Sequence, residues 1–110
     1  MAASRQAGSR PAALTAFAQS VLDTVDRIPA GKVMTYGDVA EYLGAGGPRA
    51  VGAVLRRYGR EVCWWRVLPA TGYPAPSHPA EALRHLVAEG VPLLAGGARV
   101  DLACCRWDGS

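Results

Sequence analysis

Apolar residues recur at three- and four-residue steps in four stretches of the chain, a spacing that predicts amphipathic helices. The stretches are residues 12–27, the segment that follows Thr35, residues 48 to about 58, and residues 80–89. Ile28, Pro29, Ala30 and Gly31 end the first of them, Gly44 ends the second and Gly90 ends the fourth. Glycine commonly ends a helix because it adopts the left-handed backbone conformation without steric cost.

The second and third of these helices are separated by a short glycine-rich turn. Thr35 is a good N-cap, because its hydroxyl can accept a hydrogen bond from a free N–H of the first turn. The glycines of residues 44–47 break the second helix, and Pro48 suits the first turn of the third, where its missing N–H costs nothing. Two short helices around a tight turn form the helix-turn-helix pattern, which many DNA-binding domains and some unrelated helical bundles share.

The remaining segments predict less regular structure. Residues 62–68 form an apolar run typical of a strand or a buried turn, and residues 71–76 form a loop with two prolines. Residues 91–107 fit a small hairpin or wing. We therefore predict a mainly α, winged-helix-like helix-turn-helix domain with a short β hairpin or wing. It is expected to span residues 12–110, after a disordered start at residues 1–11.

The length and composition agree with one compact domain. The chain has 110 residues and half of them are apolar, which is enough for a single hydrophobic core. Its first residues are small and polar, unlike a signal peptide, and no apolar run approaches the roughly 20 residues of a membrane helix. We expect a soluble monomer without membrane contact, located in the cytoplasm and associated with the nucleoid if the source is bacterial.

Positive charge is concentrated in one part of the chain. The formal net charge is only +3, but the segment from residue 49 to residue 66 carries a single acid, Glu61, and five arginines: Arg49, Arg56, Arg57, Arg60 and Arg66. Such a cluster suits a polyanionic partner. Taken alone, it could equally be a solvated charged surface.

The three cysteines, Cys63, Cys104 and Cys105, indicate neither disulfides nor a zinc site. Their number is odd, two of them are adjacent, and they lack the paired spacing of zinc ligands. We expect reduced thiols, no metal and no other cofactor, with Cys104 and Cys105 packed in the terminal hairpin.

Three motifs resemble the C-terminal domain of the O6-alkylguanine-DNA alkyltransferases. They read IPAGKVMTYGDVA at residues 28–40, PRAVG at residues 48–52 and VCWWRV at residues 62–67, and the likeness extends over residues 14 to 107. In that family the third motif contains Pro-Cys-His-Arg-Val, in which the cysteine accepts the alkyl group and the histidine activates it. Here Trp64 stands at the cysteine position and Trp65 at the histidine position, which is the mark of the alkyltransferase-like subfamily.

The resemblance implies that the chain binds O6-alkylguanine in duplex DNA by flipping the nucleotide, and does not dealkylate it. Alkyl transfer needs a thiolate nucleophile, which an indole cannot supply, so we expect no catalytic residue and no enzymatic activity. By the same resemblance, the bound complex would hand the lesion to nucleotide excision repair proteins. Glu89, which matches the glutamate that orients the family's histidine, is expected to be structural only.

The resemblance also assigns roles to individual residues. Arg49 matches the arginine that fills the gap left by the flipped nucleotide, and Tyr36 matches the tyrosine that pushes on its phosphate. The predicted lesion pocket consists of Tyr36, Trp64, Trp65, Arg66 and Val67. The predicted DNA-binding residues are Thr35, Tyr36, Gly47, Arg49, Ala50, Gly52, Arg56 and Arg57.

Two other functions stay open from the sequence. The first is an active alkyltransferase that uses Cys63, one residue before the lost nucleophile. We disfavour it because side chains alternate in an extended segment, so that Cys63 should face away from the pocket lined by Trp64. The second is a winged-helix transcription regulator that reads bases in undamaged DNA.

Overall fold

The structure is a computed structural model, and it describes residues 14–110. Its elements in chain order are α1 (Ala16–Arg27), β2 (Met34–Thr35), α2 (Tyr36–Leu43), α3 (Gly47–Tyr58), two 3-10 turns η1 (Gly59–Glu61) and η2 (Trp64–Arg66), β3 (Val67–Leu68), α4 (Pro79–Ala88) and α5 (Leu102–Cys105). The predicted disordered start at residues 1–11 lies outside the described residues. The mainly α fold class is confirmed, with one small sheet in which β2 and β3 pair in parallel.

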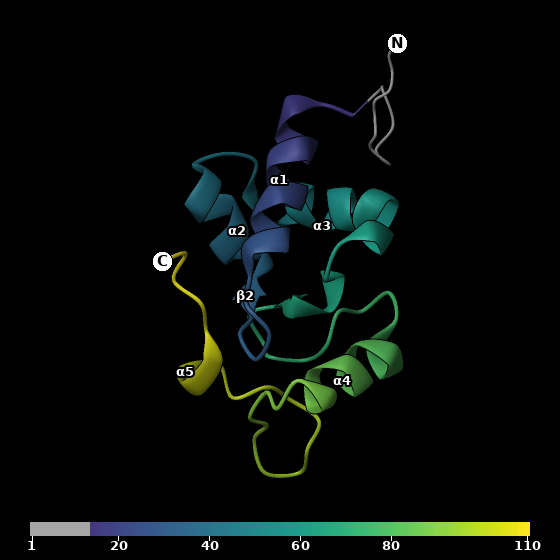
Figure 1. Cartoon of the computed structure of the whole chain (residues 1–110), viewed down its shortest axis with the longest axis vertical. Helices are drawn as coiled ribbons and strands as arrows, with labels where there is room; N and C mark the ends of the chain where they lie inside the picture. The colour runs from purple at the N-terminus through teal and green to yellow at the C-terminus, as the bar shows by residue number, and fades with distance from the viewer. Residues whose placement is uncertain (1–13) are drawn as a thin grey trace.

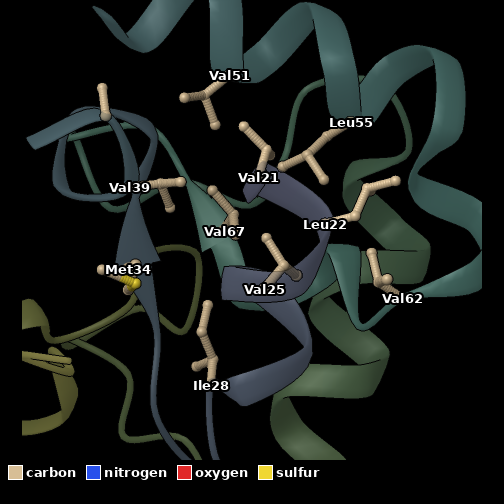
Figure 2. Close-up of a cluster of buried hydrophobic side chains, with 11 residues drawn as sticks. Val21, Leu22, Val25, Ile28, Met34, Val39, Val51, Leu55, Val62 and Val67 are labelled. Carbon is tan, nitrogen blue, oxygen red and sulfur yellow. The ribbon is translucent and has the colours of Figure 1, made fainter. Parts of the chain in front are cut away.

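Helices α1, α2 and α3 pack together in the upper part of the molecule, and α4 and α5 lie below them (Figure 1). Eleven buried residues form the core between the three helices, among them Val21, Val25, Val51 and Val67, which are fully buried. Figure 2 shows their side chains converging from α1, α3 and the small sheet. Burying each such side chain stabilises the fold by roughly 1.5–3 kcal/mol, so this cluster holds the helix-turn-helix in place.

The first helix is shorter than its periodicity predicts. It begins at Ala16, because the Thr15 hydroxyl accepts a hydrogen bond from the N–H of Ala18 and caps the helix there. Residues 12 and 13 lie outside the described residues. The C-terminal end agrees with the prediction, since Ile28 leaves the helical conformation directly after Arg27.

The helix-turn-helix forms as its local signals predict. Thr35 caps α2, Gly44 ends it in the left-handed conformation with a φ of 73°, and Pro48 lies in the first turn of α3. Gly46 precedes α3 with a φ of 86°, and a Cβ at this position would lie 2.4 Å from the ring of Phe17. The turn can therefore close against α1 only because this residue has no side chain.

A capping box forms at the start of α2, and an ion pair connects this helix to Arg106 near the C-terminus. Asp38 donates its N–H to the Thr35 hydroxyl, and its carboxylate accepts the Thr35 N–H. The same carboxylate accepts two hydrogen bonds from Arg106, at 2.8 and 2.6 Å. The hydrogen bond from Arg106 lowers the pKa of Asp38, against the opposing effect of burial.

Replacing Asp38 with alanine should therefore destabilise the protein by about 1–2 kcal/mol. The larger part comes from the Thr35 N–H, which loses its acceptor at a cost of about 1 kcal/mol although the Thr35 hydroxyl still caps the helix. The half-exposed Arg106 adds a smaller contribution because water screens it. Urea unfolding followed by circular dichroism measures the effect. Glu41→Ala on the exposed face of the same helix is the matched control and should change the free energy of unfolding by less than about 0.5 kcal/mol; equal effects of the two changes would contradict the role of the cap.

Residues 62–68 and 91–107 differ in part from their predicted forms. The apolar run is neither a full strand nor a plain turn, since it contains η2 followed by the two-residue strand β3. The terminal hairpin is reduced to one antiparallel bridge between Leu93 and Val100. Beyond it the chain forms the short helix α5, and Arg106 then bridges to Val33 in parallel, so the prediction of hairpin structure to the end was wrong.

Two negative findings apply to residues 14–110. None of the helices in this range is long and apolar enough to cross a membrane. No group of three histidine, cysteine, aspartate or glutamate side chains in the same range is arranged to hold a metal ion.

Candidate nucleic-acid interface

A cleft of about 490 Å³ lies beside α3, and we call it the α3 cleft. Its volume falls within the range of roughly 300–1,000 Å³ that is typical of ligand sites. The lining residues are Tyr36 from α2; Arg49, Gly52, Leu55 and Arg56 from α3; Gly59, Arg60 and Trp64 from the 3-10 turns; and Ala75, Pro76, Ser77, His78 and Glu81 from the loop before α4 and its first turn. In Figure 1, α3 and α4 lie on the same side of the molecule, with that loop between them.

Helix α3 supplies a basic wall. Arg49, Gly52 and Arg56 follow one another at three- and four-residue steps, so they lie on one face of the helix. A Cβ at position 52 would lie 3.9 Å from the ring of Tyr36, so the glycine leaves free space above that ring. Helix α3 therefore presents two guanidinium groups to the cleft, and the ring of Tyr36 lines the cleft beside Gly52.

Tyr36 keeps its phenolic proton in this setting. Its side chain is half-buried, and burial raises the pKa of Tyr36 above its ordinary value, against the opposing charge of Arg56. A neutral phenol can donate a hydrogen bond to an anionic oxygen such as that of a phosphate. Tyr36 is the first residue of α2 because Thr35, directly before it, is the N-cap of this helix.

Trp64 brings an indole to the α3 cleft. It lies in η2, which packs closely on the end of α3. A Cβ at Gly59 would lie only 3.3 Å from the Cβ of Trp64, which shows how close this packing is. Three rings meet the indole edge-on, with centroid distances of 5.9 Å to Trp65, 6.0 Å to His78 and 6.3 Å to His85. These contacts hold Trp64 in one orientation, with part of its surface open to the cleft.

Trp65 and Arg66 lie behind the α3 cleft and not in its lining. The indole N–H of Trp65 donates to Glu89 at 3.0 Å, and its ring stacks on His85 at 3.8 Å. Arg66 donates to both carboxylate oxygens of Glu89, with a shortest distance of 2.6 Å, and to the carbonyl of Ile28 at 2.7 Å. Glu89 is thus bound to two side chains in place of one imidazole, and its expected structural role has a physical basis.

The Arg66–Glu89 pair is largely buried, with 13% and 15% of the two side chains exposed. Burial by itself would raise the pKa of Glu89, but the hydrogen bonds from Arg66 and Trp65 together with the charge of Arg66 outweigh it, and the pKa is lowered. Both groups therefore stay charged, and the pair connects η2 to the C-terminal end of α4.

The structure separates the residues of the predicted lesion pocket into two groups. Tyr36 and Trp64 line the α3 cleft. Trp65, Arg66 and Val67 do not, and Val67 is fully buried in the core where β3 pairs with Met34. The prediction placed these three residues in the pocket by their position in the family motif beside Trp64. In the structure, the 3-10 turn points successive side chains in different directions.

The predicted DNA-binding residues also divide. Tyr36, Arg49, Gly52 and Arg56 line the α3 cleft. Gly47, Ala50, Thr35 and Arg57 lie outside its lining. Among the latter, Thr35 is 3% exposed and its hydroxyl is used by the capping box, and Arg57 extends over the ring of Tyr58 at 5.5 Å.

The cysteines lie away from the α3 cleft. Cys63 is partly exposed and, within the described chain, is not among the residues that line the cleft. This agrees with its predicted orientation, but the reason differs, since the segment is a 3-10 turn and not an extended strand. Cys105 is buried as expected, whereas Cys104 is exposed, and both lie in α5 and not in a hairpin.

Sequence reasoning missed several residues of the cleft. Leu55, Gly59 and Arg60 continue the three- and four-residue spacing of Arg49, Gly52 and Arg56, so a helical projection carried past Tyr58 could have found them. The wall formed by residues 75–78 has no periodicity, and its place opposite α3 depends on contacts across the chain. No local signal in the sequence identifies it.

The helix-turn-helix with a basic cleft beside its second helix defines the class of protein, a helix-turn-helix domain suited to a polyanion. Residues 16–91 match the family model of the 6-O-methylguanine DNA methyltransferase DNA-binding domain. The chain belongs to this family, and within it to the alkyltransferase-like proteins, as its motifs predicted.

Individual relatives support the same assignment. The chain is 40% identical over 99 residues to proteins named "DNA base-flipping protein" from Escherichia coli K12 and Shigella flexneri, covering 84% of this chain and 74% of each relative. Two crystal structures of S. pombe Atl1 are similar at 30% identity, with TM-scores of 0.72 and 0.71, over 83% of this chain and 94% of theirs. One of them contains damaged DNA with O6-carboxymethylguanine, and the other contains DNA.

Proposed function

We propose that the chain binds O6-alkylguanine in duplex DNA by rotating the damaged nucleotide into the α3 cleft, and that it leaves the alkyl group in place. The observation that carries the proposal is Trp64, an indole that lines the cleft at the position of the family's alkyl-accepting cysteine. The names of the similar proteins, a base-flipping protein and Atl1 bound to damaged DNA, support the same function.

The α3 cleft contains a group for each step of flipping. Extruding a base costs a few kcal/mol, and a planar cation that stacks in the vacated gap offsets part of this cost. Arg49, exposed near the start of α3, is placed to do so. Arg56 and the protonated hydroxyl of Tyr36 would contact the sugar-phosphate backbone, which gives affinity independent of sequence. The extruded guanine would then stack on Trp64, which is worth roughly 1–3 kcal/mol.

The groups around the cleft support the proposal that no alkyl group is transferred. Transfer needs a thiolate close to the alkyl carbon and a base that activates it. None of the described residues that line the α3 cleft is a cysteine. Glu89, at the position of the glutamate that orients the base in the transferases, is bound to the Trp65 indole and to Arg66. We propose accordingly that the protein is a lesion-binding protein and not an enzyme.

We also propose that the complex, with its bound and extruded nucleotide, marks the site for nucleotide excision repair, and that the protein acts as a monomer in the cytoplasm. These proposals rest on the family resemblance.

A fluorescence titration tests the proposed function. The protein is titrated with matched duplexes that contain O6-methylguanine or guanine at one position. The emission should change with the modified duplex at concentrations where the unmodified one has no effect, because the flipped base contacts Trp64. The same titration of Trp64→Phe, which keeps the signals of the other two tryptophans, should lose most of the response. Equal binding of the two duplexes, or binding that follows the undamaged sequence, would exclude the proposal and favour a transcription regulator.

Incubation with the O6-methylguanine duplex should leave the mass of the protein unchanged. Intact-mass spectrometry detects the 14 Da of a transferred methyl group, which replaces a thiol proton, and we expect none because no thiol reaches the α3 cleft. The Cys63→Ser variant should bind the modified duplex with the same Kd as the natural protein. A methyl adduct on Cys63, or loss of binding in this variant, would support the alternative of an active alkyltransferase.

A further inference from the structure

The wall of the α3 cleft opposite helix α3 carries a histidine in a defined position. His78 is the N-cap residue of α4, and its carbonyl accepts the N–H of Ala82 at 2.9 Å. Pro79 follows it and disfavours the helical conformation for His78, whose observed φ is −145° and ψ is 69°. The imidazole packs against Trp64 with ring centroids 6.0 Å apart and lines the cleft. His78 therefore lies beside the surface on which a flipped base would stack.

The charges around the α3 cleft are mostly positive. Arg49, Arg56 and Arg60 contribute three guanidinium groups, and Glu81 is the one acid in the lining. If Arg49 enters the duplex and Arg56 contacts the backbone, as proposed above, the guanidinium of Arg60 and the imidazole of His78 remain as hydrogen-bonding groups that can face the bound base. Within residues 14–110, neither of these two side chains makes a hydrogen bond or an ion pair.

We propose that the α3 cleft prefers O6-alkylguanines whose adduct carries a carboxylate over neutral adducts of the same shape, and that Arg60 and His78 provide this preference. The inference rests on the proposed lesion binding and specifies its ligand class. A carboxylate can accept charge-assisted hydrogen bonds from a guanidinium and from a protonated imidazole, whereas a neutral amide of equal size gains less from either.

The other charged or titratable groups in the lining of the α3 cleft are Arg49, Arg56 and Arg60 from the α3 side, Tyr36 from α2 and Glu81 from the helix that His78 precedes. Burial raises the pKa of Tyr36, so this phenol stays neutral.

A second histidine nearby provides a matched control. His85 stacks on Trp65 with centroids 3.8 Å apart and planes inclined by 11°. Its Nε2 lies 3.8 Å from Glu81 Oε2, and it is absent from the described lining of the α3 cleft. His85 thus belongs to the same aromatic cluster and is also an imidazole, but it lies outside the lining of the cleft.

The test compares two duplexes that differ only in the charge of the adduct, one with O6-carboxymethylguanine and the other with O6-carbamoylmethylguanine. The ratio of their Kd values cancels the contribution of the phosphates. At one fixed pH and salt concentration the carboxylate should bind more tightly by about two- to fivefold, the range of a solvent-accessible ion pair. His78→Gln and Arg60→Gln should each reduce this preference, and His85→Gln should keep it.

The outcomes separate this inference from the proposed function. If both lesions bind more tightly than guanine but their Kd ratio is one, the carboxylate preference is overturned. If the ratio is the same in the natural protein and in His78→Gln, the role of His78 is overturned. If neither lesion binds more tightly than guanine, the proposed function itself fails.

Discussion

Replacing Arg49 with alanine should weaken binding of an O6-methylguanine duplex by about 10- to 100-fold. Arginines at the centre of an interface commonly contribute 1.4 kcal/mol or more, and about 1.4 kcal/mol corresponds to a factor of ten. Here the lost interaction is the planar cation that would replace the flipped nucleotide in the base stack. The unmodified duplex, which binds without extrusion, should lose less affinity. The measured quantity is the ratio of the two Kd values, determined at one fixed salt concentration.

Arg57→Ala is the matched control for this experiment. Arg57 lies on the same helix and is exposed, but it extends over the ring of Tyr58 and is not part of the α3 cleft. Its loss should weaken both duplexes by a similar small factor, because a surface arginine contributes through general attraction to phosphates. An Arg49→Ala variant that weakens both duplexes equally would show that Arg49 is only another surface charge.

Replacing Glu89 with alanine should destabilise the fold by about 2–4 kcal/mol. Removing one partner of a buried ion pair leaves the other charge without compensation, which typically costs 3–5 kcal/mol for full burial, and this pair is slightly exposed. The Trp65 indole N–H loses its acceptor as well. For a domain of this size, the melting temperature should fall by about 10–25 °C in a calorimetric measurement.

Two comparisons test the cause of this destabilisation. Glu81→Ala removes a more exposed carboxylate from the same helix, 46% exposed, and should cost less than about 1 kcal/mol. A double variant with Glu89→Ala and Arg66→Met should recover part of the loss, because the uncompensated charge is then absent. A double variant that is no more stable than Glu89→Ala would show that the packing of Glu89, and not its charge, is what matters.

The contribution of Glu89 should also disappear in acid. Its pKa is lowered in the folded protein, since the hydrogen bonds from Arg66 and Trp65 outweigh the effect of burial. A lowered folded pKa means that the stabilisation is complete above the ordinary glutamate pKa of about 4.3 and is lost as the pH falls through the folded value. The difference in stability between the natural protein and Glu89→Ala should therefore be constant from pH 5.5 to pH 8 and shrink below about pH 4.

The sequence by itself determined the helices and the family. Residues such as Thr35, Gly44 and Pro48 act on their own backbone neighbours, so α2 and α3 begin and end where these local signals predict. The family followed from three short motifs and is confirmed over residues 16–91. The place of Trp64 in the cleft could also be predicted from the sequence, because Trp64 stands at the cysteine position of the third motif.

Only the tertiary structure decided how the two tryptophans divide their roles. Trp64 lines the α3 cleft, whereas Trp65 turns away to donate to Glu89, which is 24 residues later in the chain. The sequence also carries no sign that residues 75–78 form the opposite wall, or that a short helix at residues 102–105 is followed by Arg106, which binds Asp38 of α2. These features depend on contacts between distant segments and on the direction of side chains in a 3-10 turn, and neither is encoded by local spacing.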